Sequence, residues 1–154
     1  MPKRELVDER LTHSVIGGFF AVYNELGYGF LESVYAAALE QELVGRGHRV
    51  AREVPVSVYF KGLEVARQRL DCVVDERLIV ECKSTLDLKK TALRQVYNYL
   101  RATNLEVGLL LHFGPEPQFF RVFRSNRGPI LERYGNGNSN RPNSDETDAT
   151  DAPD

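Results

Sequence analysis

The chain has 154 residues, of which 42% are hydrophobic and 27% are charged, and these proportions are ordinary for one soluble globular domain. No apolar run approaches the length of a membrane span, and the first ten residues lack the apolar core of a signal peptide, so we expect a cytoplasmic location and no membrane partner. Three scattered histidines offer no zinc-binding spacing. The two cysteines, Cys72 and Cys82, are expected to be buried thiols.

The net charge of −2 is unevenly distributed along the chain. Residues 135–154 contain five acidic residues and one arginine, a net charge of −4, which leaves about +2 for residues 1–134. The same C-terminal segment is rich in Gly, Asn, Ser, Asp, Thr and Pro, which is typical of disorder. We therefore expect one domain over residues 1–134 and a disordered acidic tail over residues 135–154. The weak positive charge of the domain neither requires nor excludes a nucleic-acid partner.

Two helices are expected in the N-terminal third. Apolar residues recur at helical spacing from about residue 8 to 26, and the same spacing returns from about 31 to 46. The inward positions of the second helix are Glu32, Tyr35, Leu39 and Leu43. A carboxylate at Glu32 on this face is costly unless it is paired or bound to a metal. Alternatively, Glu32 lies at the rim and only favours the positive end of the helix dipole.

The pattern changes to that of β-strands over residues 48–60, and a Lys-Gly turn follows at 61–62. Two β-branched apolar runs then flank residues 75–77, which predicts a hairpin with a three-residue loop. If Val74 pairs with Leu78, one face of the hairpin is wholly apolar, whereas a two-residue loop leaves neither face uniform. The predicted cross-strand pairs are Cys72–Val80 and Leu70–Cys82 on one face, and Val73–Ile79, Asp71–Glu81 and Arg69–Lys83 on the other.

This register places Asp71 opposite Glu81, and two carboxylates in that position repel unless something offsets their charge. A divalent cation such as Mg²⁺ would do so. Lys83 points to the same side and could orient a water molecule or stabilise developing negative charge. Arg67 and Arg69 are expected on the face of Asp71, where they suit phosphate contacts or are plain surface charge. The alternative for the whole face is a solvated strand with an ion pair of negligible strength.

A third helix is expected from about residue 86 to 103. Its inward stripe comprises Leu88, Ala92, Gln95, Tyr99 and Thr103, and its basic outer face comprises Lys90, Arg94 and Arg101. Gln95 is thus a further polar residue aimed at the sheet, unless it only packs against Tyr99 one turn away. Strands are expected at 107–113 and 118–123. The order of elements predicts an α/β fold with a mixed sheet flanked by helices.

The segment Gly29-Phe-Leu-Glu32-Ser-Val-Tyr35 forms a G-x-x-E-x-x-Y string. With it the chain resembles the GxxExxY protein family, a small prokaryotic branch of the PD-(D/E)XK nuclease superfamily, over about residues 11 to 123. The other strings that carry the similarity are Leu26-Gly27, Lys61-Gly62, the Asp71 strand, Glu81-Cys82-Lys83, Gln95 to Leu100, Val107 to Leu111 and His112-Phe-Gly114. The chain departs from the family pattern at Tyr23, Tyr28 and His112, none of which is an expected metal ligand.

The resemblance implies a restriction-endonuclease-like α-β-β-β-α-β core and a nuclease that uses Mg²⁺, or alternatively Mn²⁺, to cleave DNA. The implied catalytic residues are Glu32, Asp71, Glu81, Lys83 and Gln95. The implied metal ligands are Glu32, Asp71, Glu81 and the carbonyl of Cys82, and the expected substrate contacts are Arg67, Arg69, Arg94 and Tyr99. A homodimer is a further expectation from the superfamily. The alternative is a module on the same fold that binds nucleic acid or protein without cleavage.

Overall fold

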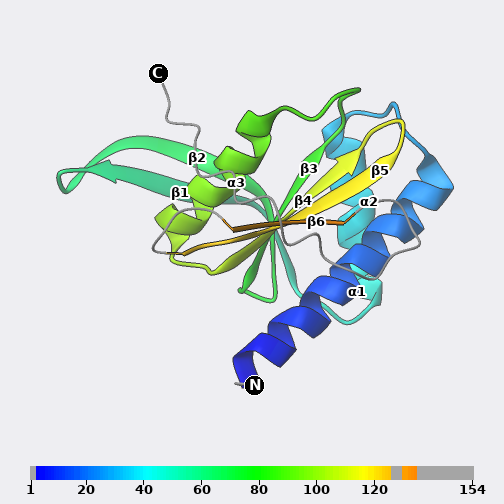
Figure 1. Cartoon of the computed structure of the whole chain (residues 1–154), viewed down its shortest axis with the longest axis horizontal. Coiled ribbons are helices and arrows are strands. Elements are labelled where there is room, and N and C mark those ends of the chain that lie inside the picture. The colour runs from blue at the N-terminus through cyan, green and yellow to red at the C-terminus, as the bar shows by residue number, and fades with distance from the viewer. Residues whose placement is uncertain (1–2, 126–129, 135–154) are drawn as a thin grey trace.

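The computed structural model describes residues 3–125 and 130–134, with side chains over residues 9–125. Within these residues, three helices and six strands follow one another along the chain (Figure 1). The helices are α1 (Lys3–Leu26), α2 (Glu32–Gly45) and α3 (Lys90–Thr103). The strands are β1 (Val50–Phe60), β2 (Leu63–Val74), β3 (Leu78–Lys83), β4 (Val107–Phe113), β5 (Pro117–Phe123) and β6 (Ile130–Tyr134). The predicted order of elements is confirmed, and β6 is a strand that the sequence pattern did not predict.

All six strands belong to one mixed sheet and lie in the order in which they occur in the chain. β3 and β4 are parallel, with α3 as the connection between them, and the other neighbouring pairs are antiparallel. In Figure 1, α3 covers one face of the sheet, and α1 and α2 pack together on the other. The predicted α/β class with a helix-flanked mixed sheet is therefore confirmed.

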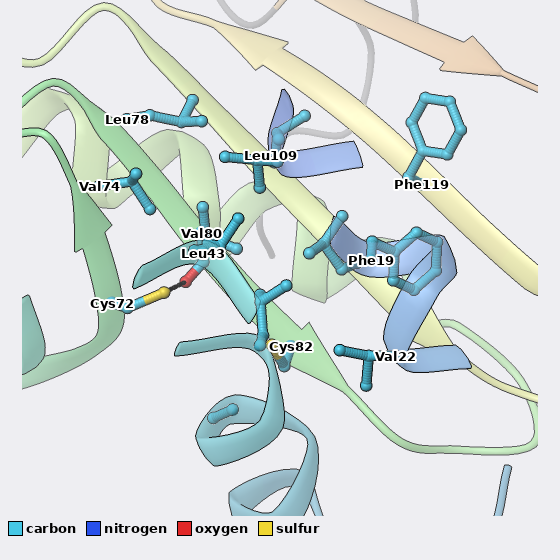
Figure 2. Close-up of a cluster of buried hydrophobic side chains, with 14 of the residues drawn as sticks. Phe19, Val22, Leu43, Cys72, Val74, Leu78, Val80, Cys82, Leu109 and Phe119 are labelled. Carbon is cyan, nitrogen blue, oxygen red and sulfur yellow. Dashed lines mark hydrogen bonds between the residues drawn. The ribbon is translucent and has the colours of Figure 1, made fainter. Parts of the chain in front are cut away.

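Alternating strand residues fill two cores, one on each face of the sheet. The α1–α2 core includes Phe19, Leu43, Val80, Leu109 and Phe119 (Figure 2), together with Tyr35 and Phe113. The α3 core includes Leu70, Ile79, Val96, Leu100 and Leu110. Cys72 and Cys82 are free thiols inside the α1–α2 core, as predicted, and burial raises the pKa of Cys72 to about 12. Each large side chain buried in these cores contributes on the order of 2 kcal/mol, so the strands are held firmly in place.

Two adjacent glycines within α1, Gly17 and Gly18, let α2 approach closely. A Cβ atom on Gly18 would lie 2.9 Å from Cδ2 of Leu43, and one on Gly17 would lie 2.9 Å from Nη1 of Arg46. Gly18 therefore has no room for a side chain next to the buried Leu43, whereas the end of the Arg46 side chain could move away from position 17. The close approach fixes α2, and with it the loop that precedes α2, against the sheet.

The β2–β3 hairpin has the predicted register, with Val74 paired to Leu78 and Cys72 paired to Val80. Its three-residue loop has positive φ angles at Asp75 (51°) and Glu76 (60°), a conformation that aspartate tolerates better than most residues. Pairing of the two strands ends at Cys72, however. The expected pairs Leu70–Cys82, Asp71–Glu81 and Arg69–Lys83 are not part of the strand register, because β2 and β3 diverge at this point.

The divergence coincides with an irregularity between β1 and β2. Their register passes from Arg52–Cys72 to Val54–Leu70, and Glu53, which lies between these pairs, has a φ of 51°. Cys72 packs in the α1–α2 core, whereas Leu70 packs in the α3 core. The prediction that Leu70 and Cys82 share one apolar face is therefore wrong, because the alternation of side chains is interrupted at Asp71.

The carboxylate of Asp75, in the loop of the β2–β3 hairpin, connects this loop to two other segments of the chain. The Nδ1 atom of His48 lies 2.7 Å from Oδ2 of Asp75, and the Nε2 atom of His48 lies 2.7 Å from Oγ of Ser14. The backbone N–H of Arg49 donates to Oδ1 of Asp75 over 2.8 Å. Ser14 lies in the middle of α1, where backbone N–H groups are used within the helix and no oxyanion site is available. We therefore interpret Ser14, His48 and Asp75, here called the Asp75 clamp, as structural.

β1 and β2 continue past the body of the protein as a long hairpin (Figure 1). Nearly all of β2 before Leu70 is exposed. In the part of the chain that the structure describes, no helix is both long and apolar enough to cross a membrane. The predicted tail, residues 135–154, lies outside the described residues.

Candidate active site

Asp71 and Glu81 face each other where β2 and β3 diverge. The backbone N–H of Asp71 donates to Oε1 of Glu81 over 2.9 Å, and the backbone N–H of Cys82 donates to Oδ2 of Asp71 over 2.8 Å. Each carboxylate therefore accepts a hydrogen bond from the opposite strand in place of a backbone carbonyl. The side chains of Asp71 and Glu81 thus fix the point where β2 and β3 diverge. They bring the two carboxyl groups together, although not through the predicted strand pairing.

The environment of this pair disfavours two negative charges. Glu81 is only 3% exposed, and its burial, followed by the charge of Asp71, raises the pKa of Glu81 to about 8. Lys83 and the N–H of Asp71 act in the opposite direction and offset only part of this shift. Burial and the charge of Asp71 thus favour retention of a proton on the pair. A divalent cation would replace that proton, and the oxygen donors available here are of the type that Mg²⁺ and Mn²⁺ prefer.

Glu32 lies at the first residue of α2, but it is exposed and not part of the buried stripe. Of the two positions considered for Glu32, the structure has the one at the rim and not the inward one, whereas Tyr35, Leu39 and Leu43 of the same stripe are fully buried. Among the described residues, no group of three or more His, Cys, Asp or Glu side chains is arranged to hold a metal ion. The carboxylate pair of Asp71 and Glu81 thus stands without a third acid, and Glu32 occupies the rim.

A polar pocket of about 740 Å³ opens beside α3. The lining residues used below are Glu32, Gln68, Lys83, Lys89, Arg94 and Gln95. Four residues predicted for the site, one acid, two cations and Gln95, therefore share one cavity. Its three cationic side chains outnumber its two acidic ones, Glu32 and Asp87, so the lining is net positive, which suits a phosphate group.

Two residues of α3 connect the polar pocket to the carboxylates. Nε2 of Gln95 donates to the hydroxyl oxygen of Tyr99 over 2.9 Å. Tyr99 is buried, and its burial, followed by the charge of Glu81, raises the pKa of Tyr99. The hydroxyl therefore lies within the electrostatic influence of the carboxylate pair. Arg94 lies on the exposed face of α3, one turn before Tyr97, and its guanidinium is 5.0 Å from the ring centre of Tyr97.

Arg67 and Arg69 lie apart from this group on the projecting hairpin. Both are exposed, and they form ion pairs with Glu64 at 3.5 Å and Glu53 at 3.9 Å. Gln68, which alternates with them along β2, lines the polar pocket instead. The two arginines therefore do not share the face that holds the site. Because the alternation of side chains is interrupted at Asp71, the residues before it point to the opposite face of the sheet from the one predicted.

A second cavity, which the sequence did not predict, lies next to the polar pocket. This aromatic pocket has a volume of about 600 Å³. The lining residues used below are Tyr28, Phe30, Leu31, Glu32, Thr85 and Leu86. The signal in the sequence was a run of aromatic and apolar residues, from Tyr28 to Leu31, in a glycine-containing connection where polar residues are usual.

His112 is a further residue whose part in the site was not predicted. It lies at the end of β4, where its backbone pairs with Lys83, and its ring is buried. Nε2 of His112 lies 2.7 Å from the carbonyl oxygen of Thr85, so the ring donates a hydrogen bond there. This contact fixes the segment after β3, which separates the two pockets.

Comparison with known proteins identifies the family of the chain. A family model for the PD-(D/E)XK nuclease superfamily matches residues 9–122. A search of curated proteins found no match. Among solved structures, the crystal structure of SSO0001 is 19% identical with a TM-score of 0.49, and the match covers 80% of this chain and 62% of that one. Because the family match covers most of the sequence, the chain belongs to the PD-(D/E)XK nuclease superfamily.

Proposed function

We propose that the protein is a metal-dependent nuclease of the GxxExxY type that hydrolyses phosphodiester bonds of DNA with Mg²⁺, or alternatively Mn²⁺. The observation that supports the proposal most strongly is the contact between the half-buried Asp71 and the buried Glu81, in which the pKa of Glu81 is raised to about 8. Perturbed carboxyl groups in contact with each other are common at catalytic sites. The polar pocket with Lys83, Arg94 and Gln95 adds the groups that a phosphodiester would need.

The ion would be held by the carboxylates of Asp71 and Glu81 and by the carbonyl oxygen of Cys82. Two carboxylates are sufficient, because Mg²⁺ usually keeps several water molecules and completes its shell with substrate phosphate oxygens. When bound, the ion supplies Lewis-acid polarisation of the phosphoryl oxygen and lowers the pKa of a coordinated water. Glu32, at the rim, would act through an ordered water rather than as a direct ligand.

The chain's own side chains would position the substrate and stabilise charge. Lys83, half-buried beside the carboxylates, would donate to a non-bridging oxygen and orient the attacking water. Gln95, fixed by its hydrogen bond to Tyr99, would hold the phosphate, and Arg94 would contact the next phosphate along the strand. Arg67 and Arg69, both exposed, would contribute only a screened, long-range attraction.

The direct test is a cleavage assay on single-stranded, duplex and branched DNA, and on RNA, with Mg²⁺, Mn²⁺ or EDTA. We expect metal-dependent cleavage by the wild type and its loss in Lys83→Ala. Lys61→Ala, which removes a lysine at the tip of the projecting hairpin, is the matched control and should cleave normally. Equal cleavage by the wild type and Lys83→Ala would refute the assignment, because the activity would then come from a contaminant.

A module that binds nucleic acid or protein without cleavage is the alternative. Calorimetric titration separates the two, since a nuclease of this kind binds Mg²⁺ and a module that has lost turnover through its metal site does not. DNA affinity that falls steeply with salt would indicate phosphate contacts, and a flat response would indicate a protein partner. The expected homodimer and cytoplasmic, prokaryotic setting remain predictions, and sedimentation of the purified protein tests the first.

A further inference from the structure

The loop before α2 exposes aromatic rings at the edge of the site. Tyr28 and Phe30 leave 56% and 48% of their surface exposed, and their neighbour Leu31 leaves 75% exposed. All three line the aromatic pocket. Large apolar side chains gathered on one exposed loop around a cavity are typical of a binding surface. The catalytic proposal made above does not use them.

The loop is fixed from below, so these rings are presented in one arrangement. The hydroxyl of Tyr35 donates to the carbonyl of Gly27 over 2.7 Å and accepts from the N–H of Phe30 over 3.3 Å. Ser84 donates to the carbonyl of Phe30. The ring of Tyr35 is itself stacked on Phe113, with 4.1 Å between the ring centres. Exposed rings on a pre-organised loop lose little entropy when a ligand binds.

The motif from Gly29 to Tyr35 thus has a physical explanation. Gly29 has a φ of 108°, which only glycine adopts without strain, and it lets the chain turn into α2. Tyr35 holds the turn from inside, and Glu32 marks its boundary with the polar pocket. The motif therefore builds a rigid aromatic loop beside the polar pocket.

The two pockets adjoin, because Glu32 and Thr85 line both of them. One pocket carries the cations Lys83, Lys89 and Arg94, and the other is largely aromatic and apolar. A nucleotide has the same division into a charged phosphate and a flat, stackable base. A protein partner or a second copy of this chain would have no need of the cations next to the rings.

We propose that the aromatic pocket binds an unpaired base of the strand whose phosphate occupies the polar pocket, with Tyr28 and Phe30 as the stacking surface. The substrate class is then a single strand or a frayed end, because a base inside a duplex must be unpaired and unstacked before it can reach the rings. This inference rests on the proposed function and specifies its substrate.

The test measures binding in EDTA, where no cleavage occurs, with a 20-nucleotide DNA strand that carries one 2-aminopurine, alone or in a duplex. Stacking on an aromatic ring quenches the fluorescence of 2-aminopurine. We expect quenching of the single strand by the wild type and by Tyr28→Phe/Phe30→Tyr, which keeps both rings. Tyr28→Ala/Phe30→Ala should lose the quenching and bind the single strand roughly 5- to 100-fold more weakly.

Tyr59→Ala is the matched control, because Tyr59 is 65% exposed on the projecting hairpin and should have no effect. Unchanged quenching and affinity in the double alanine variant, or equal losses for single strand and duplex, would overturn the inference. If the wild type then still cleaved DNA with metal, the proposed function would survive, whereas no cleavage of any substrate would overturn both. A wild-type dimer that dissociates in the double alanine variant would also overturn the inference, since a second copy would then cover the rings.

Discussion

Asp75 and Glu81 lie six residues apart in the same hairpin, yet their pKa values are shifted in opposite directions. Burial alone would raise the pKa of Asp75, but hydrogen bonds from the N–H of Arg49 and the ring of His48 outweigh it and lower that pKa. Burial and the charge of Asp71 raise the pKa of Glu81 to about 8, and Lys83 and one backbone N–H offset little of it. The first carboxylate is stabilised by its neighbours, and the second is not.

The difference separates a structural acid from a candidate catalytic one. Asp75 is satisfied within the folded chain, so its ionised form contributes to stability. Glu81 accepts a hydrogen bond from the N–H of Asp71, but its burial and the charge of Asp71 outweigh this contact, so its ionised form weakens the fold in the absence of a cation. Substitutions at the two positions should therefore have opposite effects on stability and on catalysis.

The largest effect is expected on cleavage. Asp71→Asn removes a charge from the carboxylate pair and should lower kcat by roughly 10²- to 10³-fold, because the charge that holds the ion is halved. Asp75→Asn makes the same chemical change at the loop and should alter kcat less than twofold below its melting temperature. Similar losses for both variants in a steady-state cleavage assay would contradict the distinction between the two acids.

The pH dependence of stability should come next in size. Because the folded-state pKa of Glu81 lies above its unfolded value, the folded protein binds the extra proton, and stability falls as pH rises from about 4.5 to about 8. Urea unfolding in EDTA should show a loss on the order of 3 kcal/mol between pH 5 and pH 8. Glu81→Gln should flatten this slope, and Mg²⁺ should restore the wild type at pH 8. Parallel slopes for the two proteins would count against the buried, uncompensated charge.

The Asp75 clamp should give a smaller effect of opposite sign. The folded-state pKa of Asp75 is lowered, so its stabilisation is present above the unfolded pKa and is lost as pH falls through the folded value. Asp75→Asn should cost about 1–2 kcal/mol at pH 7, and the cost should shrink as pH falls through the folded-state pKa of Asp75, where the wild type becomes protonated as well. Mg²⁺ affinity, measured by calorimetry, should not change. A variant as stable as the wild type at pH 7 would show that the clamp does not stabilise the fold.

The smallest effect is expected at the hydroxyl of Tyr99. Tyr99→Phe removes the oxygen that accepts the hydrogen bond from Gln95 and should reduce kcat/KM by less than about tenfold, since the amide remains in place. Gln95→Ala should have the same or a larger effect, and the double variant should be no worse than Gln95→Ala. Additive losses would show that the two residues act separately.

The sequence predicted the parts of this fold that local pattern determines. Apolar periodicity identified α1, α2 and α3, and uniform burial selected the correct register at Val74 and Leu78. The same register also predicted that Asp71 and Glu81 lie close together. The reasoning failed where a strand departs from ideal alternation, because the irregularity at Glu53 is set by pairing with β1 and leaves no trace in the residues around Asp71.

Contacts between distant segments were also beyond the sequence. The Asp75 clamp joins residues 34 and 27 positions apart, and its members show no spacing that would suggest a pair. Glu32 was assigned to a buried stripe because helical periodicity does not say where the sheet edge ends. The predicted roles of all the site residues, as catalytic groups, metal ligands or substrate contacts, remain predictions.

The ring of His112 limits the size of the residue at position 114, in the turn after β4. A Cβ atom on Gly114 would lie 2.6 Å from Cε1 of His112, so any larger residue there must displace the imidazole. The displaced ring would release the carbonyl of Thr85, and Nδ1, which is buried and has no hydrogen-bond partner among the described residues, could not replace that anchor. The residues at positions 112 and 114 are therefore expected to change together in evolution. Such a paired change could alter the segment between the aromatic and polar pockets while leaving Asp71 and Glu81 unchanged.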